Sequence, residues 1–126
     1  MTQEDKELLL KDLAARLPYG VKIELTWWVM GEGIGINTTL EPECIEELLN
    51  DEDGDTEIKP YLFPLSRMTK EQKMFLRQQK WCIAISTSGT VETTIEGIDW
   101  LNKNHFDYHG LIEKGLAIDA TGLNIY

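Results

Sequence analysis

The chain has 126 residues, of which 42% are hydrophobic and 27% are charged, so its composition is that of a globular protein and excludes wholesale disorder. Its 22 acidic and 12 basic side chains give a formal net charge of −10 at pH 7, which disfavours direct binding to nucleic acid, since that binding needs clustered Lys and Arg. A chain of this length is expected to fold as a single domain, residues 1–126, around one core.

The chain also lacks the signals of export and membrane insertion. No apolar run approaches the roughly 20 residues that a membrane-spanning helix needs. Residues 1–5 are acidic, whereas a secretory signal begins with positive charge. Cys44 and Cys82 form neither a C-x-x-C pair nor a disulfide framework. We therefore expect a cytoplasmic protein with no membrane association and no cofactor.

The first half of the chain predicts helices and a β-hairpin. Thr2 and Asp5 have the spacing of a capping box, and the apolar residues that follow recur at helical intervals until Pro18. The pattern then alternates as in a half-buried strand. The predicted elements are a helix over 3–17, a strand over 21–30, a turn at 31–33, a strand over 34–40 and a helix over 42–50.

The second half predicts shorter elements: an extended segment over 58–65, a helix over 70–80, strands over 81–87 and 90–93, helices over 94–104 and 108–114, and a strand over 116–118. Pro60 and Pro64 lack the amide hydrogen that a central strand needs, so 58–65 is expected to be an edge strand or an extended crossing segment. Asp107 is expected to cap the last helix. The fold class predicted is α+β, with one small antiparallel or mixed sheet of about four strands and four to five helices packed on it.

Acidic side chains are concentrated in residues 41–57, which contain no Lys or Arg. The nine carboxylates of this stretch are Glu41, Glu43, Glu46, Glu47, Asp51, Glu52, Asp53, Asp55 and Glu57. The remainder of the chain has 13 acidic and 12 basic side chains and is almost neutral. The stretch is therefore a candidate surface for a basic partner, with Glu43, Glu46, Glu47, Asp51, Asp53 and Asp55 as its candidate binding residues.

Two apolar residues interrupt the polar side of the strand over 21–30. Trp28 and Met30 fall opposite Trp27 and Val29, so both faces of the strand are apolar at this end. Either helices cover both faces, or a small apolar patch is left exposed for a partner. We include Trp28 and Met30 among the candidate partner-binding residues.

A second candidate site is the H-x-D-x-H segment His105, Asp107 and His109. In an extended strand, alternate residues share a face, so the three side chains could ligate one metal ion. If Asp107 instead caps a helix, the three side chains diverge. The segment supports an alternative reading of the chain as a metal-dependent or His/carboxylate enzyme.

Asp51, Asp53 and Asp55 are spaced like the start of a calcium-binding loop. Thr56 stands where such a loop needs Gly, and Leu62 stands where it needs an acidic ligand. A solvated acidic loop is therefore the better interpretation.

Several stretches resemble blocks of a known family: residues 5–13, 15–21, 58–62, 66–69, 99–103, 105–108 and 110–117. They are similar to an uncharacterised family of short acidic proteins from gut Bacteroidetes and their mobile elements and phages. Members often carry Arg at the position of His109 and a different tail at 119–126, which separates those positions from any fixed chemical task. The family has no assigned function, so the resemblance implies an origin and no chemistry.

These observations favour a non-catalytic interaction protein that presents residues 41–57 to a protein partner with a basic surface. In a mobile-element or phage setting, such a protein could inhibit a nucleic-acid-binding protein by imitating phosphate charge. The alternative is the small enzyme centred on residues 105–109. The sequence leaves the oligomeric state and the identity of the partner open.

Overall fold

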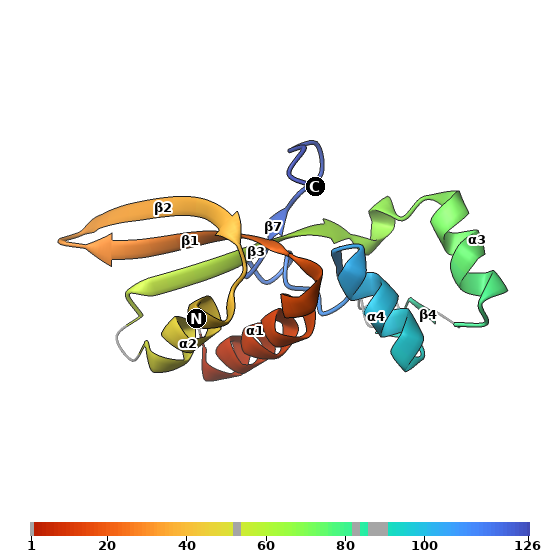
Figure 1. Cartoon of the computed structure of the whole chain (residues 1–126), viewed down its shortest axis with the longest axis horizontal. Helices are drawn as coiled ribbons and strands as arrows, with labels where there is room; N and C mark the ends of the chain where they lie inside the picture. The colour runs from red at the N-terminus through yellow and green to blue at the C-terminus, as the bar shows by residue number, and fades with distance from the viewer. Residues whose placement is uncertain (1, 52–53, 82–83, 86–90) are drawn as a thin grey trace.

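The computed structural model describes residues 2–51, 54–81, 84–85 and 91–126. Its elements are α1 (Gln3–Arg16), η1 (Leu17–Tyr19), β1 (Lys22–Val29), β2 (Glu32–Thr39), α2 (Pro42–Asn50), β3 (Thr56–Pro64), η2 (Leu65–Arg67), α3 (Lys70–Gln78), β4 (Ala84–Ile85), β5 (Val91–Glu92), α4 (Ile95–Lys103), β6 (Phe106–Asp107) and β7 (Ile118–Asp119). Strands β2, β1, β3 and β6 lie side by side in that order, and β7 also pairs with β3 (Figure 1). The parallel pairs of β3 and the antiparallel β1 pairs make this a mixed sheet, so the predicted α+β class is confirmed.

Three of the four described α-helices, α1, α3 and α4, begin at a threonine N-cap. Thr2 accepts a hydrogen bond from the backbone N–H of Asp5 at 3.1 Å, and Thr94 accepts one from Gly97 at 3.2 Å. Thr69 and Gln72 form a reciprocal capping box at the start of α3. Each cap satisfies amide hydrogens that have no partner within the helix. None of the described helices is long and apolar enough to cross a membrane.

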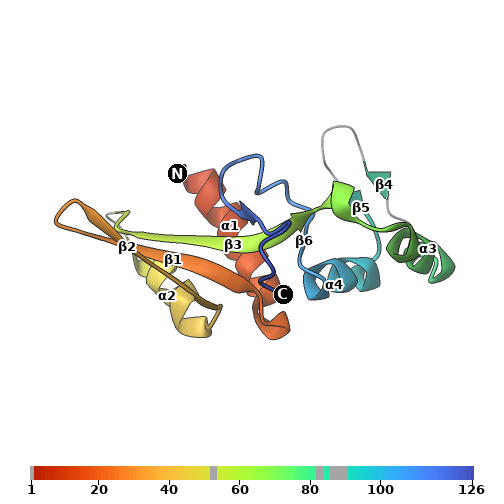
Figure 2. The ribbon, with the colours of Figure 1, turned by 90° about the horizontal axis from the view of Figure 1, so that it is seen from above.

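The β1–β2 hairpin is regular, with consecutive pairs from Lys22↔Thr39 to Val29↔Glu32. Its turn consists of Met30 and Gly31, at φ of 52° and 80°, and so lies one residue earlier than predicted. Two residues with positive φ form the tight turn whose twist matches that of the strands. The hairpin extends past the ends of α2 and β3 (Figures 1 and 2).

Strand β3 lies in the middle of the strand order, so of the two alternatives predicted for 58–65, an edge strand or an extended crossing segment, the edge strand is wrong. Residues 56–60 pair with β1. Residues 61–62 pair with β7, and residues 63–64 pair with β6. Pro60 is the last residue in register with β1, and Pro64 ends the strand. The missing amide hydrogens therefore fall where the pairing changes or stops, which is how a central strand tolerates both prolines.

The predicted helix over 108–114 is also wrong, because Tyr108 and His109 form a bend and residues 111–115 form turns. Asp107 belongs to β6, and its carboxylate accepts hydrogen bonds from the backbone N–H of Leu111 at 2.9 Å and of Ile112 at 3.0 Å. Gly110 and Gly115 both have positive φ, which interrupts a helix at either end. The capping carboxylate was identified correctly, but it closes a turn.

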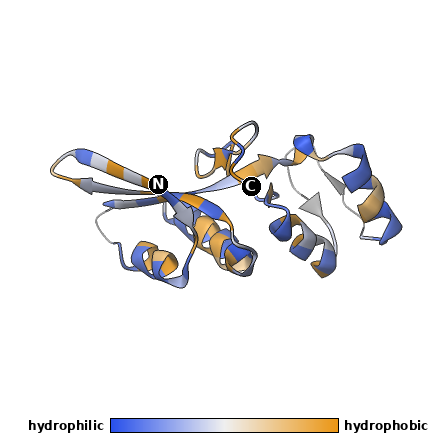
Figure 3. Cartoon of the chain, turned by 45° about the horizontal axis from the view of Figure 1, so that its top comes forward, coloured by the Kyte–Doolittle hydropathy of each residue, from blue (hydrophilic) through white to orange (hydrophobic). Residues whose placement is uncertain are grey.

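Two groups of buried side chains form the interior. The first lies between the sheet and helices α1 and α2 and includes Leu13, Ile23, Leu48 and Leu62. The second includes Leu76, Leu101 and Phe106 beside α3 and α4. Figure 3 shows hydrophobic segments on the helices below the sheet and also on the projecting hairpin. Strands β4 and β5 pair with each other, and the remainder of the predicted strands over 81–87 and 90–93, with Cys82, falls largely outside the described residues.

Candidate functional site

A shallow, open groove of about 500 Å³ is lined by residues of helix α2 and of strands β1 and β3. Its lining residues come from β1, from α2 and the residue after it, and from the start of β3: Trp27, Glu43, Glu46, Glu47, Asn50, Asp51 and Thr56. Four of these seven side chains are carboxylates of the acidic stretch. We call this feature the acidic groove.

Helix α2 presents its acidic side to the groove because its other side is needed for the core. Leu48 is buried, and Cys44 and Ile45 pack against the same group of apolar side chains. Glu43, Glu46, Glu47 and Asn50 follow the spacing i, i+3, i+4 and i+7, which gives one continuous stripe on a helix. Within the described part of the chain, none of the groove carboxylates forms a salt bridge. The stripe therefore keeps its negative charge available to a partner.

An apolar strip continues from the groove along the hairpin, and we define this hairpin stripe as Trp27, Val29, Ile34 and Ile36. Cross-strand pairing puts Ile34 beside Trp27 and Ile36 beside Leu25. All four side chains point to the same face of the sheet, and this face is buried where the helices cover it. Leu25 is 4% exposed, whereas Ile36 is 45%, Ile34 is 55% and Val29 is 54% exposed. The core face of the sheet thus continues into solvent beyond the end of α2.

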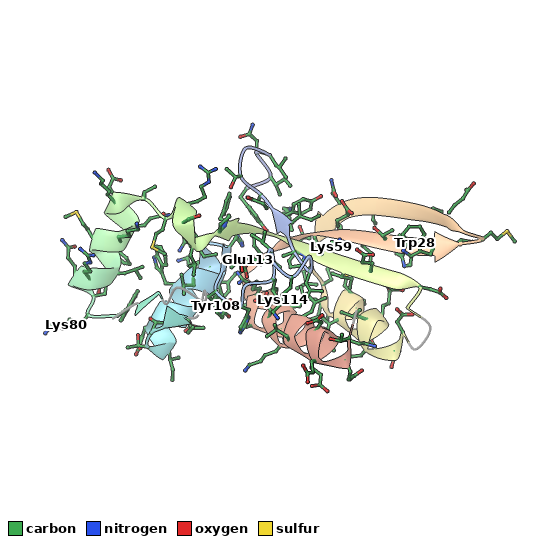
Figure 4. The ribbon with its side chains drawn as sticks, turned by 180° about the vertical axis from the view of Figure 1, so that it is seen from behind. Trp28, Lys59, Lys80, Tyr108, Glu113 and Lys114 are labelled. Carbon is green, nitrogen blue, oxygen red and sulfur yellow. The ribbon has the colours of Figure 1, made fainter. Side chains whose placement is uncertain are left out.

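Trp28 and Met30 lie apart from the acidic groove. Trp28 points to the opposite face of the hairpin and lies against Gly33, where an added Cβ would be 3.1 to 3.3 Å from the ring (Figure 4). Trp28 is 49% exposed, and Met30 is fully exposed at the turn. Of the two possibilities for these residues, the structure has the exposed patch, but it faces away from the acidic helix.

The predicted acidic residues divide into three groups. Glu43, Glu46, Glu47 and Asp51 line the groove. Asp55 is exposed in the loop before β3, and Asp53 lies outside the described residues. The carboxylate of Asp51 accepts hydrogen bonds from the backbone N–H groups of Asp55 and Thr56, both at 3.1 Å, so it ends the loop as a local cap.

Sequence reasoning missed Trp27 and the rest of the hairpin stripe as site residues. It assigned Trp27 and Val29 to the buried face because their alternation matches that of Ile23 and Leu25. The sequence does contain a signal for them, which is the difference in length, in ångströms, between helix and strand. The hairpin strands have eight residues each and α2 has nine. A nine-residue helix spans about 14 Å, whereas an eight-residue strand spans about 26 Å, so the helix cannot cover the whole strand.

The structure does not bring the H-x-D-x-H side chains together on one ligand. His105 stacks on Tyr126 with ring centroids 3.7 Å apart, Asp107 accepts the two backbone hydrogen bonds described above, and His109 Nδ1 lies 2.7 Å from Asp12. Burial, together with the charge of Arg16, lowers the pKa of His105 to about 4. Among the described residues, no group of three or more His, Cys, Asp or Glu side chains could hold a metal ion.

His109 instead contacts the buried ion pair of Asp12 and Arg16. Arg16 Nε donates to Asp12 at 2.6 Å, and the guanidinium also donates to the carbonyl of Phe106 at 2.5 Å. Burial alone would raise the pKa of Asp12, but the hydrogen bonds and charges of His109 and Arg16 outweigh it and hold that pKa below its ordinary value. The three side chains join α1 to β6 and the following turn, and their partners are all internal.

A larger hollow, of about 810 Å³, lies near the N-terminal end of α1 and is lined in part by Lys6, Lys59 and Lys114. Figure 4 labels Lys59 and Lys114. Its charges are of both signs. Lys59 forms a salt bridge with Glu57 at 3.0 Å, and Lys6 donates to the carbonyl of Asp51 at 3.1 Å. The hollow therefore lacks the single sign of charge that distinguishes the acidic groove.

Comparisons with protein families, with curated proteins and with solved structures find no match for this chain. The chemistry of the acidic groove and of the hairpin stripe is therefore the basis on which a function is proposed.

Proposed function

We propose that this protein is a non-catalytic interaction protein whose acidic groove binds a basic, amphipathic segment of a protein partner. One observation carries the proposal: four carboxylates, none with a salt bridge in the described residues, line one groove together with Trp27, next to an exposed apolar stripe. Charge and apolar surface are thus adjacent, as a basic amphipathic segment requires.

The two parts of the site contribute differently to binding. The carboxylates of α2 attract a basic segment over a distance and raise the rate of encounter. Trp27 can accept a Lys or Arg side chain over its ring, and the hairpin stripe can bury apolar side chains of the partner. Apolar burial supplies most of the affinity, since exposed ion pairs contribute little individually.

Proteins that bind nucleic acid carry clustered Lys and Arg, and so they are the class of partner that this groove fits best. The acidic groove would occupy such a surface in place of phosphates. We place this inhibition in the cytoplasm, in the mobile-element or phage setting expected from the sequence.

The proposal is tested by affinity capture from a bacterial lysate with three forms of the full chain: wild type, E43Q/E46Q/E47Q, and E4Q/E7Q/E71Q as a control. The control variant removes the same number of charges from exposed positions on α1 and α3. We expect basic proteins to be retained by the wild type and the control and lost from the groove variant.

The affinity for a captured partner should fall about tenfold or more in the groove variant and should decrease with added salt. A W27A variant should weaken binding without changing the net charge. If no basic partner is captured, or if both triple variants bind as the wild type does, the acidic groove is not the binding site.

A further inference from the structure

Strand β2 forms an open edge of the sheet. In the described residues its only neighbour is β1, and six of its eight residues are exposed. Natural edge strands are protected by Lys, Pro, bulges or covering segments. Residues 32–39 contain no Lys, Arg or Pro, and the pairing with β1 continues through eight consecutive pairs without a bulge. Such an edge can accept another strand.

The hairpin turn determines which backbone groups of β2 point outward. In a two-residue turn the flanking residues, Val29 and Glu32, hydrogen bond to each other, and the bonded pairs then alternate along the strands. Ile34, Ile36 and Thr38 therefore bond to β1. Trp28 is not in a bonded pair with β2, and its N–H donates instead to the backbone carbonyl of Asp55, at 3.0 Å, on the side of β1 away from β2. This agrees with the alternation. Gly33, Gly35 and Asn37 thus direct their backbone groups to the open edge.

The segment of β2 that contains these three residues, Gly33-Ile34-Gly35-Ile36-Asn37, has a sequence that is nearly symmetric about Gly35. If two copies pair antiparallel with Gly35 opposite Gly35, then Gly33 lies opposite Asn37 and the outward backbone groups meet in bonded pairs. Ile34 lies opposite Ile36 of the other copy, on one face. Glu32, the only charged residue of β2, lies opposite Thr38 and meets no like charge.

We propose that β2 pairs with β2 of a second copy of this chain about a two-fold axis at Gly35, which joins the two sheets. Ile34 and Ile36, now 55% and 45% exposed, would form a strip of four isoleucines across the axis. A dimer of this kind would present two acidic grooves to one partner assembly, which raises the effective affinity for a repeated basic surface.

The size and charge of the contact determine how the dimer should behave. Pairing of one strand buries less than the roughly 800 Å² per partner of a standard stable interface, so the dimer should dissociate on dilution. Each copy carries a net charge of −10, and the repulsion between copies is screened by salt. Dimerisation should therefore strengthen as salt is added, whereas partner binding through the acidic groove should weaken.

Sedimentation equilibrium of the full chain tests this proposal over concentrations from about 10 μM to about 1 mM, at low and high salt. The wild type should shift from 14.4 kDa toward twice that mass, more completely at high salt. The variant I34K/I36K should remain monomeric, because each Lys lies opposite a Lys of the other copy. The control I95K/L123K places the same two charges at other exposed apolar positions and should dimerise as the wild type does.

A charge-exchange experiment tests the register itself. I34K/I36K and I34E/I36E should each be monomeric and should form a mixed dimer when combined. A wild type that stays monomeric throughout, or a lysine variant that still dimerises while circular dichroism shows it to be folded, would overturn the proposal. Because E43Q/E46Q/E47Q should leave the dimer intact, failure of the groove and failure of the edge contact give different results.

Discussion

His109 Nδ1 lies 2.7 Å from Oδ2 of Asp12, a carboxylate that helix α1 holds fully buried, 97 positions away in the sequence. The other oxygen of Asp12 accepts a hydrogen bond from Arg16, which is also fully buried. This contact ties the segment that looks most like an active site to the first helix of the chain. Its consequences are structural and can be measured as stability.

Replacing Asp12 by Asn should lower the free energy of unfolding by about 3 kcal/mol, because Arg16 would remain buried without its counter-charge. Nη1 of Arg16 already has no hydrogen-bond partner among the described residues, so little compensation is available. Urea denaturation followed by circular dichroism measures the change. As a control, H109Q leaves the Asp12–Arg16 pair intact and should cost about 1 kcal/mol. An equal loss of unfolding free energy in the two variants would contradict the conclusion that the Asp12 carboxylate compensates the buried charge of Arg16.

Stability should depend on pH through His105. Its pKa in the folded protein is about 4, against an ordinary value of 6.5, because burial and then Arg16 disfavour its charged form. As the pH falls from 6.5 to about 4, the unfolded chain binds a proton that the folded chain does not, so the free energy of unfolding decreases over this window. The lowered pKa of Asp12 adds a separate loss of stability at still lower pH.

The H105N variant isolates the first of these effects. Asn tolerates the positive φ of 62° at this position but does not titrate. The fall in urea midpoint between pH 6.5 and pH 4 should be shallower in H105N than in the wild type. An unchanged slope would assign the pH dependence to other groups.

Replacing Met30 by Asn should stabilise the protein by about 0.5 kcal/mol, because Met30 adopts a φ of 52° in the hairpin turn and Asn fits that conformation better. Met30 is fully exposed, so no packing is lost. Met74, which is exposed on helix α3, provides the matched control, since M74N should destabilise by a few tenths of a kcal/mol through helix propensity. Thermal unfolding compares the two, and a loss of stability in M30N would show that its side chain contributes to the fold.

The side chain of Tyr126 forms hydrogen bonds with the backbone of β3 and β1. Its hydroxyl donates to the carbonyl of Tyr61 at 2.7 Å and accepts from the N–H of Lys22 at 2.8 Å. Partial burial raises the pKa of Tyr126 to about 12, so the hydroxyl is protonated at neutral pH and can donate. Y126F should lower the free energy of unfolding by about 1 to 2 kcal/mol, measured by urea denaturation.

The matched control for Y126F is Y19F, because the Tyr19 hydroxyl has no described hydrogen bond and its removal should change stability little. Amide hydrogen exchange gives a second measurement, and the N–H of Lys22 should exchange faster in Y126F. Full protection of that amide in Y126F would exclude this role for the hydroxyl.

Local patterns predicted the elements that depend on neighbouring residues. Thr2, Thr69 and Thr94 each cap the helix that follows, because a hydroxyl needs only the amide hydrogen three residues on. The acidic stripe of α2 could likewise be derived from helical spacing. Asp107 shows the limit of such reasoning, since its carboxylate was identified as a cap but the helix expected after it does not form.

The sequence by itself determined helices α1 to α4, the hairpin, the α+β class and the acidity of residues 41–57, because each depends on composition or on contacts a few residues apart. Only the tertiary structure decided that β3 is a central strand, that His109 binds Asp12 and that Trp27, not Trp28, faces the acidic helix. These relations depend on strand order and on how far one helix extends beneath a longer hairpin. Both are set by packing between segments that are distant in sequence, which no local pattern encodes.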